Sequence, residues 1–353
     1  MNKIALSGII LGSLVLLAAL GLGFFLLWMN ANEYRPDDLE TVEVSQNPAL
    51  RPVFNHPIEL YSWNIGYASL DASQDFFTAG GRGVRPPTDS NVEANIWAIQ
   101  AFLSGNAPDI VFLQEVDRDS KRSYGVDEAG YFSGTWKGSS AYAANYRCKF
   151  VPLPLFRFTG RVESGLLTLN SYGAASAERL ALPAPFDWPE RLVRFKHCLL
   201  VERVPIQDSG AQLVLVNAQL ARDGGDQTGL LASFCQAEYE RGNYVVAGGG
   251  FNRSFPGLED AFPLREGNFA PPPLDPNLFG EGWIFAADPS VPGSRLLDRP
   301  YEKGAADNQF FLGDGFILSP NVTLISVETV DLDFKNSDHN PVKLAFSLPQ
   351  NGP

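Results

Sequence analysis

Cysteine and histidine are scarce in this sequence, with three residues of each among 353. Cys148, Cys198 and Cys235 form neither a C-x-x-C pair nor another metal-ligand spacing, which excludes a cysteine-based zinc site. Each cysteine has apolar or helical neighbours in the sequence. We therefore expect three buried thiols, with one disulfide plus one free thiol as the alternative.

An excess of basic residues is also missing. Lys and Arg number 27 against 40 Asp and Glu, which gives a formal net charge of -13. Proteins that follow the phosphates of long nucleic acids usually carry a basic patch, because their affinity comes from neutralising those charges. The acidic balance therefore disfavours long nucleic acid as a partner. It does not exclude a phosphate ligand bridged by a metal ion, because carboxylates are needed to hold the cation.

One long apolar run stands at the start of the chain. Residues 4–29 carry no charge, and about 20 such residues span a bilayer as a helix. The run exceeds the roughly 7–15 residues of a signal-peptide core and lacks a clear cleavage site. We expect a retained transmembrane anchor over residues 1–29, with a cleaved signal as the alternative. Lys3 precedes the run and acidic residues follow it, which predicts a single-pass protein of the cell membrane with an extracytoplasmic domain.

The rest of the chain divides into a polar tether over residues 30–57 and a domain over residues 58–350. We expect strands over residues 59–65, 109–116, 164–169, 198–204, 212–220, 244–247, 315–318, 322–327 and 342–346, and helices over residues 92–103 and 227–241. The Pro- and Gly-rich residues 256–300 predict a long surface excursion. Mixed strands with few helices indicate an α+β fold, in which two sheets pack face to face under helices.

Polar residues stand where several of these strands end. In chain order the segments read Asn64-Ile65, Gln114-Glu115-Val116, Asn217-Ala218-Gln219-Leu220, Gly249-Gly250-Phe251-Asn252, Asp314-Gly315-Phe316 and Ser337-Asp338-His339-Asn340-Pro341. Rigid strand ends hold such side chains in fixed geometry, so binding and catalytic sites are often built there. Each segment alone also has a structural interpretation, as a turn former, a solvated strand end or an Asx turn.

Taken together and in this order, the segments resemble the endonuclease/exonuclease/phosphatase superfamily. That superfamily includes deoxyribonuclease-like nucleases, abasic-site endonucleases, inositol phosphatases and bacterial sphingomyelinases. The resemblance covers residues 59–348, and residues 314–322 resemble a membrane-anchored bacterial branch of it. It implies a two-sheet β-sandwich flanked by helices, and a Mg²⁺-dependent phosphodiesterase or phosphatase activity on a phosphate ester.

The resemblance also implies roles for individual residues. Glu115 matches the glutamate that holds Mg²⁺ or Mn²⁺, and Asn64 lies beside it and orients it. Glu115, Asn64 and Asp314 together are the expected metal-binding residues. Asn252 matches an asparagine that hydrogen-bonds the phosphate, and Asp314 an aspartate near the metal and phosphate. Asp338 and His339 match a pair in which the carboxylate fixes the imidazole tautomer and the imidazole handles a proton.

Two positions depart from the family pattern. Gln219 stands where the pattern has histidine, and Gly250 stands where it has the aspartate that orients or activates the attacking water. Glutamine cannot exchange a proton near neutral pH, so each change could cost about 10²–10⁴ in rate, without the two losses multiplying. The metal ion would then be weakly bound, or it would support only a slow residual activity.

Three readings follow from these departures: an impaired hydrolase, a pseudoenzyme that binds a phosphate-containing ligand without turnover, or a recent loss of function in a chain otherwise built as an enzyme. The remaining titratable residues offer no rescue. His56 and His197 are expected to be structural, and Asp223 and Asp226 to lie in a solvated loop. The substrate and the oligomeric state stay open.

Overall fold

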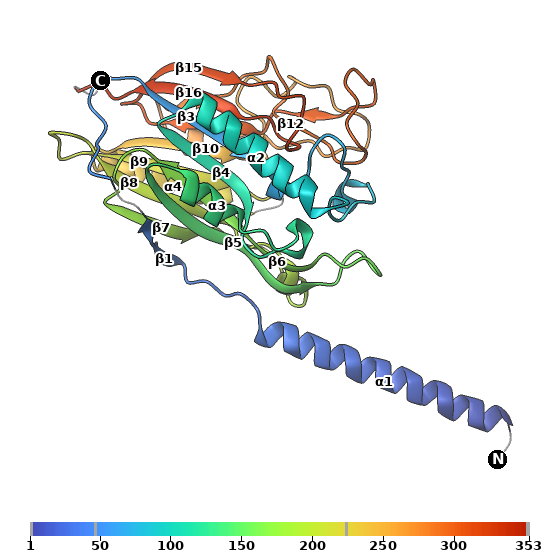
Figure 1. Cartoon of the computed structure of the whole chain (residues 1–353). Coiled ribbons are helices and arrows are strands. Elements are labelled where there is room, and N and C mark those ends of the chain that lie inside the picture. Colours follow the sequence, from blue (N-terminus) through green and yellow to red (C-terminus); the bar gives the residue numbers. More distant parts are fainter. Residues whose placement is uncertain (1–2, 46–47, 223–224, 351–353) are drawn as a thin grey trace.

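The computed structural model describes residues 3–45, 48–222 and 225–350, and it consists of one long N-terminal helix and a two-layer domain (Figure 1). Helix α1 (Lys3–Ala31) projects away from the domain. Its segment Leu6–Ala31, 26 residues long, is long and apolar enough to cross a membrane. The side chain of Met29 near its end is buried against the domain, at 3% exposure.

Two seven-stranded mixed sheets make up the two layers of the domain. The first has the order β1 (Leu39–Val42), β7 (Ser176–Ala181), β8 (Cys198–Pro205), β9 (Gln212–Gln219), β10 (Tyr244–Gly250), β14 (Asp314–Leu318) and β11 (Ile284–Ala286). The second has the order β15 (Thr323–Thr329), β16 (Val342–Ser347), β3 (Ile58–Asn64), β4 (Ile110–Asp117), β6 (Gly160–Asn170), β5 (Ser139–Val151) and β2 (Val44–Ser45). A separate pair joins β12 (Ser294–Arg295) and β13 (Phe310–Phe311).

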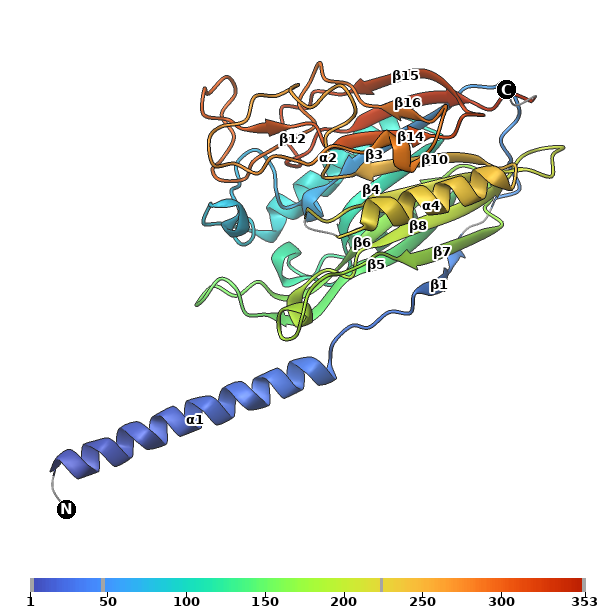
Figure 2. The ribbon, with the colours of Figure 1, turned by 180° about the vertical axis from the view of Figure 1, so that it is seen from behind.

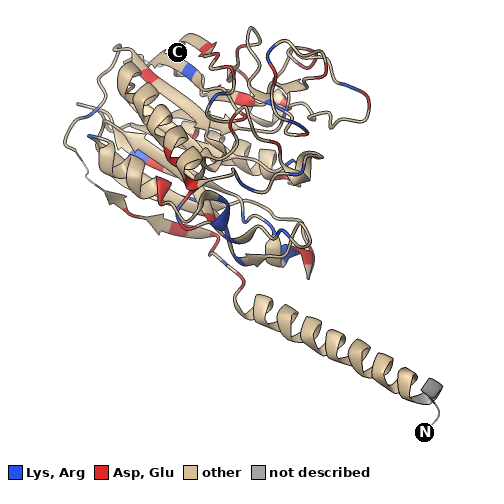
Figure 3. Cartoon of the chain, turned by 45° about the vertical axis from the view of Figure 1, so that its right-hand side comes forward, with Lys and Arg blue, Asp and Glu red and all other residues tan. Residues whose placement is uncertain are grey.

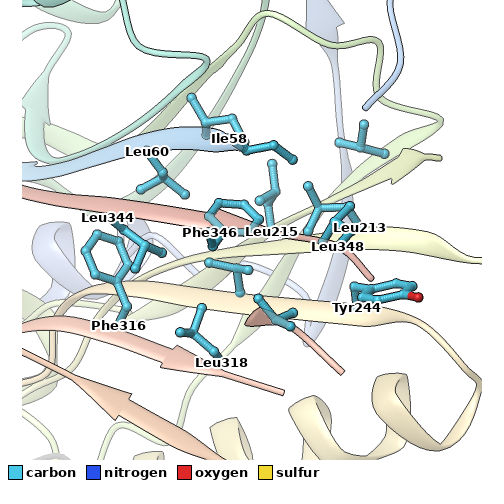
Figure 4. Packing of buried hydrophobic residues seen from close by; sticks show 14 of the residues in the cluster. Ile58, Leu60, Leu213, Leu215, Tyr244, Phe316, Leu318, Leu344, Phe346 and Leu348 are labelled. Atoms are coloured by element: carbon cyan, nitrogen blue, oxygen red, sulfur yellow. The ribbon is translucent and has the colours of Figure 1, made fainter. Parts of the chain in front are cut away.

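The main core lies between the two sheets (Figure 4). Side chains alternate between the two faces of a strand, so Leu213 and Leu215 of β9 enter this core while Val214 and Val216 face outward. The outer face of the first sheet is covered by α4 (Gln227–Glu240), and that of the second by α2 (Asp89–Asn106) and α3 (Glu128–Thr135). Figures 1 and 2 show these helices on opposite sides of the sandwich.

The strands and helices expected from the sequence are all present, with ends that differ by a few residues. Two long elements were not anticipated, the 13-residue strand β5 and helix α3. Strand β5 is rich in Ser and Ala, so its sequence lacks the β-branched run that marks a strand. The prediction of buried cysteines is confirmed, because Cys148, Cys198 and Cys235 are all buried and free.

Two expectations about irregular segments are wrong in part. Within the expected tether, β1 pairs with β7 and β2 pairs with β5, so this segment adds an edge strand to each sheet. Within the expected excursion over residues 256–300, β11 pairs with β14, β12 pairs with β13, and Phe279 is fully buried. Edge strands this short carry too little periodicity to be recognised from sequence.

Glu202 of β8 is fully buried between the sheets, where its Oε2 accepts a hydrogen bond from Asn170 Nδ2 of β6 at 3.1 Å. Its Oε1 has no hydrogen-bond partner among the described residues. Burial raises the pKa of Glu202 to about 7, against the opposing effect of the Asn170 bond. The pKa of Glu202 in the folded chain is therefore higher than its ordinary value of 4.5. The protonated carboxyl stabilises the fold fully below pH 4.5, and this stabilisation is lost as the pH rises towards 7.

Glu202→Gln is therefore expected to flatten this pH dependence, because the amide stays neutral. Between pH 4.5 and 7 the unaltered chain should lose about 3 kcal/mol of unfolding free energy as Glu202 ionises. The Glu202→Gln variant should not show this loss. Denaturant unfolding of the full chain in detergent at both pH values measures it, with the exposed Glu281→Gln as control. Parallel pH profiles for Glu202→Gln and the unaltered chain would contradict the assignment.

Candidate active site

Strand register brings the polar strand ends to one edge of the sandwich. Gly250 of β10 lies opposite Gln219 of the parallel strand β9 and opposite Asp314 of the antiparallel strand β14. Asn64 ends β3 in the facing sheet, and the neighbouring strand β4 carries Glu115. Residues from both layers therefore meet at one place, although up to 275 positions separate them in the sequence (64 to 339).

A hydrogen bond between the layers fixes the strands just behind this edge. The Gln114 side-chain amide donates to Asn217 Oδ1 at 2.9 Å, and Asn217 Nδ2 donates to the carbonyl oxygens of Leu113 and Leu167. Both side chains are fully buried. Gln114 Oε1 has no hydrogen-bond partner among the described residues, so the link rests on the Gln114 NH2 group and on Asn217. These bonds join the two sheets beneath the site.

Glu115 is held in a strained position by two side-chain amides. The β4–β6 register shifts between Leu113 and Val116, and Glu115 within this bulge has a φ of 54°. Its Oε1 accepts hydrogen bonds from Asn64 Nδ2 at 3.0 Å and from Gln219 Nε2 at 2.7 Å. Bulges and positive φ values of this kind often direct a side chain into a functional site. Neither amide bonds Oε2, which leaves that oxygen for a ligand.

Asn64 acts as the orienting residue that the sequence suggested. Its Oδ1 accepts a hydrogen bond from the backbone N–H of Gly66 at 3.0 Å, which fixes the amide so that Nδ2 points to Glu115. Direct coordination of a metal by Asn64 was also among the expectations, but its oxygen is already engaged in this turn. The geometry therefore favours a role through Glu115.

The His339 imidazole is paired with Asp314. Its Nδ1 lies 2.9 Å from Asp314 Oδ2, whereas its Nε2 is 3.9 Å from Asp338 Oδ2. In this geometry Asp314 contacts the ring and Asp338 does not, so the role expected of Asp338 stays a prediction. Asp338 is adjacent in sequence, but the β14 strand end brings Asp314 to the ring. Burial by itself would lower the pKa of His339, but the Asp314 and Asp338 carboxylates outweigh it and raise the pKa to about 9.

Asp338 instead lies close to Glu115 across the site. Burial raises the pKa of Asp338 to about 6, the His339 charge opposes this, and the Glu115 carboxylate adds to it. Gly66 allows this arrangement, because it has a φ of 51° and a Cβ there would lie 2.9 Å from Asp338 Oδ1. Asp338 is buried and Glu115 is half-buried, and two carboxylates that line the same cavity create a demand for positive charge.

This donor set fits a hard cation. Within the described parts of the chain there is no group of three or more His, Cys, Asp or Glu residues that could hold a metal. Mg²⁺ does not require one, because it commonly keeps several waters and binds through one or two carboxylates together with substrate phosphates. Glu115 and Asp338 could supply those carboxylates, as the two facing acids at the site.

These residues surround a cavity of about 210 Å³. It is also lined by Arg222 and Arg295, which the sequence reasoning missed. Arg295 is 5% exposed, donates from Nη2 to the carbonyl oxygens of Asp71 and Gln74, and has an Nε without a hydrogen-bond partner among the described residues. No signal in the sequence marks either arginine, because both lie outside the recognisable segments. One buried and one exposed guanidinium group beside a cavity suit an anionic ligand.

Asn252 and Gly250 also line the cavity. Asn252 has a φ of 51° and donates one amide hydrogen to the Leu220 carbonyl oxygen at 2.7 Å, which leaves the other for a ligand. A Cβ added at Gly250 would lie 3.3 Å from Asp314 Oδ1 and would meet no other atom within 4 Å. The structure therefore has nearly enough room for a side chain at Gly250.

Neither Gln219, which is not titratable, nor His197 and Asp226 replace the missing proton-transfer groups. The Gln219 side-chain oxygen accepts from Asn145 Nδ2 at 3.2 Å, so its amide is oriented at both ends. His197 Nδ1 bonds the backbone oxygen of Gln219 from behind, and burial lowers the pKa of His197 to about 4. Asp226 accepts from Gly229 N as the N-cap of α4. Asp223 lies outside the described residues.

Comparison with known proteins was made for both sequence and structure. The model of the Endonuclease/Exonuclease/phosphatase family matches residues 61–339. No curated protein sequence matches the chain. Similar solved structures include an endonuclease/exonuclease/phosphatase from Beutenbergia cavernae DSM 12333, with a TM-score of 0.54 and 17% identity over 84% of this chain and 72% of that one.

Two further solved structures are more distant. An endonuclease/exonuclease/phosphatase from Bacteroides vulgatus has a TM-score of 0.49 and 14% identity over 83% of this chain and 100% of that one. TDP2 from Caenorhabditis elegans has a TM-score of 0.46 and 15% identity over 83% of this chain and 75% of that one. At such identities the Beutenbergia structure supports the fold of this chain and nothing more specific.

Proposed function

Because the chain belongs to the endonuclease/exonuclease/phosphatase family, we propose that it is a divalent-metal-dependent hydrolase of phosphoric esters with a weakened proton-transfer site. The observation that supports this most directly is the cavity itself. The Glu115 and Asp338 carboxylates and the Asp314–His339 pair line the same 210 Å³. A chain that had lost all use for the site would have no reason to keep both pairs in register.

Glu115 and Asp338 would hold Mg²⁺ or Mn²⁺, which, when bound, supplies positive charge against the phosphoryl oxygens and polarises a water molecule. His339 carries an N–H that can donate to a phosphoryl oxygen, and Asp314 holds the ring and stabilises its charge. Asn252 and Arg295 supply further donors to the same cavity. These groups bind and orient the phosphate.

The weakness of the site lies in moving the proton of the attacking water. Gly250 has no carboxylate to accept that proton, and the Gln219 amide cannot exchange one near neutral pH. Gln219 instead donates to Glu115 at 2.7 Å and so holds the metal-binding carboxylate. We therefore expect slow turnover that depends on the metal and on orientation of the phosphate.

A second candidate is a binding module that keeps the phosphate pocket without turnover. The engagement of Gln219 with both Glu115 and Asn145 favours it, because this network makes a fixed, fully bonded wall where the family pattern has histidine. The location is also part of the proposal. The apolar helix α1 would anchor the protein in the cell membrane, with the domain on the extracytoplasmic side, and in Figure 3 its tan ribbon shows no charged position.

The test is hydrolysis of bis(p-nitrophenyl) phosphate by the full chain in detergent micelles, with Mg²⁺ and then with a chelator. We expect slow turnover that is lost on chelation and in Glu115→Gln, and that persists in the matched surface variant Glu93→Gln, whose side chain is exposed on α2. Binding of inorganic phosphate with no Mg²⁺-dependent turnover would instead support the binding module. Turnover that survives Glu115→Gln would contradict the assigned metal ligand.

A further inference from the structure

A second, larger cavity opens beside the candidate site. This apolar groove has a volume of about 760 Å³ and shares Thr78, Glu115, Leu297 and Asp338 with the site cavity. Its remaining wall includes the polar or charged residues Arg122, Thr159, Glu190 and Arg194, but most of it is hydrophobic, formed by Tyr67, Leu70, Phe76, Phe77, Tyr146, Val151, Leu153, Val193 and Phe195. The volume lies in the range of pockets that enclose small organic ligands. A molecule placed in the groove would have one end at Glu115 and Asp338.

The wall of the groove is continuous with the packing of α1 on the domain. Met29 of α1 belongs to one hydrophobic cluster with Tyr146 and Val151, which also line the groove. Phe25, one turn earlier in the helix, packs edge-on against Phe150 with ring centroids 6.0 Å apart. Phe25 lies inside the segment that is apolar enough to cross a membrane. The groove therefore lies beside the place where α1 would enter the bilayer.

The loop between β5 and β6 extends the same surface. Figures 1 and 2 show the β5–β6 end of the sandwich on the side from which α1 projects. In this loop Leu155 is 69% exposed and Phe156 is 93% exposed, and Phe158 stacks edge-on against Phe150. Apolar side chains exposed next to a membrane-spanning helix suit insertion into the bilayer interface.

Phe156 has an unfavourable conformation in a β-turn at the loop tip, which is closed by a hydrogen bond from Arg157 N to the Pro154 carbonyl oxygen at 3.1 Å. Its φ is 67°, a left-handed value that favours Gly or Asn and disfavours a bulky side chain. The ring makes almost no contact within the protein to offset this cost, given its 93% exposure. A strained, solvent-exposed phenylalanine at a loop tip points to a contact outside the domain. Because α1 lies nearby, the bilayer is the surface that this side chain would contact.

We propose that the substrate is a phosphate ester of a membrane lipid, with its hydrocarbon chain in the apolar groove and its phosphate in the site cavity. This assignment rests on the proposed hydrolase function and on α1 as a membrane anchor. Leu153 at the base of the loop lines the groove, so the loop and groove form one path from the bilayer to Glu115. The lipid reaches the site by moving out of the bilayer along this path.

The test compares two probes that share a reacting centre and differ only in their tails, hexadecyl p-nitrophenyl phosphate and methyl p-nitrophenyl phosphate. In both, the water oxygen bonds to phosphorus, the bond to p-nitrophenolate breaks and the water proton passes to solvent. Full-length protein in phosphatidylcholine vesicles should show a kcat/KM at least about tenfold higher for the hexadecyl ester, because burying even two methylene groups supplies that factor.

Two variants separate the groove from mere enrichment of the long ester in the vesicle. Leu153→Asp places a charge in the groove at a side chain that is 48% exposed, and Phe156→Asn removes the ring while relieving the left-handed strain. Both should reduce the hexadecyl preference, measured in each variant as the ratio of kcat/KM for the hexadecyl ester to kcat/KM for the methyl ester. Ile325→Thr, at an exposed apolar position on the edge strand β15, should retain the preference.

The possible failures are distinct. Equal kcat/KM values for the two esters would overturn the lipid assignment and leave the hydrolase proposal standing. A hexadecyl preference that persists in Leu153→Asp would also overturn it, because partitioning into the vesicle would then account for the preference. Absence of hydrolysis of either ester would overturn the proposed function, and the lipid assignment with it.

Discussion

Replacing Gln219 with histidine and Gly250 with aspartate in the same protein is expected to raise kcat for phosphodiester hydrolysis by about 10²–10⁴. The reason is that the rest of the site is in place. Glu115, Asp338, Asp314 and His339 line one cavity, and what it lacks is a group that can take a proton from water. The measurement is Mg²⁺-dependent hydrolysis of bis(p-nitrophenyl) phosphate by the full chain in detergent.

The structure indicates what each of these two changes must overcome. A Cβ at position 250 would lie 3.3 Å from Asp314 Oδ1, so a new carboxylate there requires a small shift of Asp314. The charge of His339 beside Asp314 offsets the added negative charge. At position 219 the histidine loses the bond that Gln219 donates to Glu115, and Asn64 alone then orients that carboxylate. Each single variant is therefore expected to gain less than the pair.

The control for this gain is the same double replacement in the Glu115→Gln background, which should stay inactive because the metal-binding carboxylate is gone. Thermal unfolding of each variant shows whether the fold is kept. A correctly folded double variant without higher turnover would mean that the site lacks more than these two groups. It would then favour the binding module over the impaired hydrolase.

The sequence predicted single site residues better than it predicted contacts between residues that lie far apart along the chain. Asn64 and Glu115 lie at the ends of strands whose apolar pattern is visible, and Asn252 follows another such strand. Asp338 precedes the strand β16, and the resemblance to the family implied that all four meet at one site. The pairing of Asp314 with His339 could not be read in the same way. It depends on where β14 ends relative to β10, and no local pattern encodes the register of two strands separated by more than 60 residues.

Residues outside the recognisable segments were missed for a different physical reason. Arg295 belongs to the two-residue strand β12. The groove wall combines side chains from the short 3-10 helices Gly66–Ala68, Phe77–Ala79 and Glu190–Val193, from β5 and from the loop after it. Surfaces assembled from many short pieces have no periodicity of their own. The tether was misjudged for the same reason, because β1 and β2 add only 4 and 2 residues to the sheet edges. Sequence patterns here identify the ends of long strands and not the loops that would select a substrate.

The assignment of roles to the two aspartates can be decided by separate asparagine variants. Asp314→Asn is expected to lower kcat by about 10²–10⁴ and leave the Mg²⁺ concentration for half-maximal activity unchanged, because Asp314 contacts the His339 ring at 2.9 Å. An aspartate-to-asparagine change beside the catalytic histidine of serine proteases costs about 10⁴ for the same reason, loss of the correct ring orientation and tautomer. Asp338→Asn should instead raise the Mg²⁺ concentration required.

Both variants are best measured in the chain that carries histidine at 219 and aspartate at 250, where the expected rate leaves room for a large decrease, and repeated in the unaltered chain. Mg²⁺ titration at saturating ester separates the two roles, since a metal ligand shifts the titration midpoint and a ring partner lowers its plateau. Glu93→Gln is the control, because this side chain is exposed on α2 and does not line the site cavity. The opposite outcome would be a lower plateau in Asp338→Asn and a shifted midpoint in Asp314→Asn. The pairing of Asp338 with His339 expected from the sequence would then describe the working enzyme better than the Asp314–His339 contact seen here. Such a reversal would mean that the His339 ring turns from Asp314 to Asp338 when metal and phosphate bind.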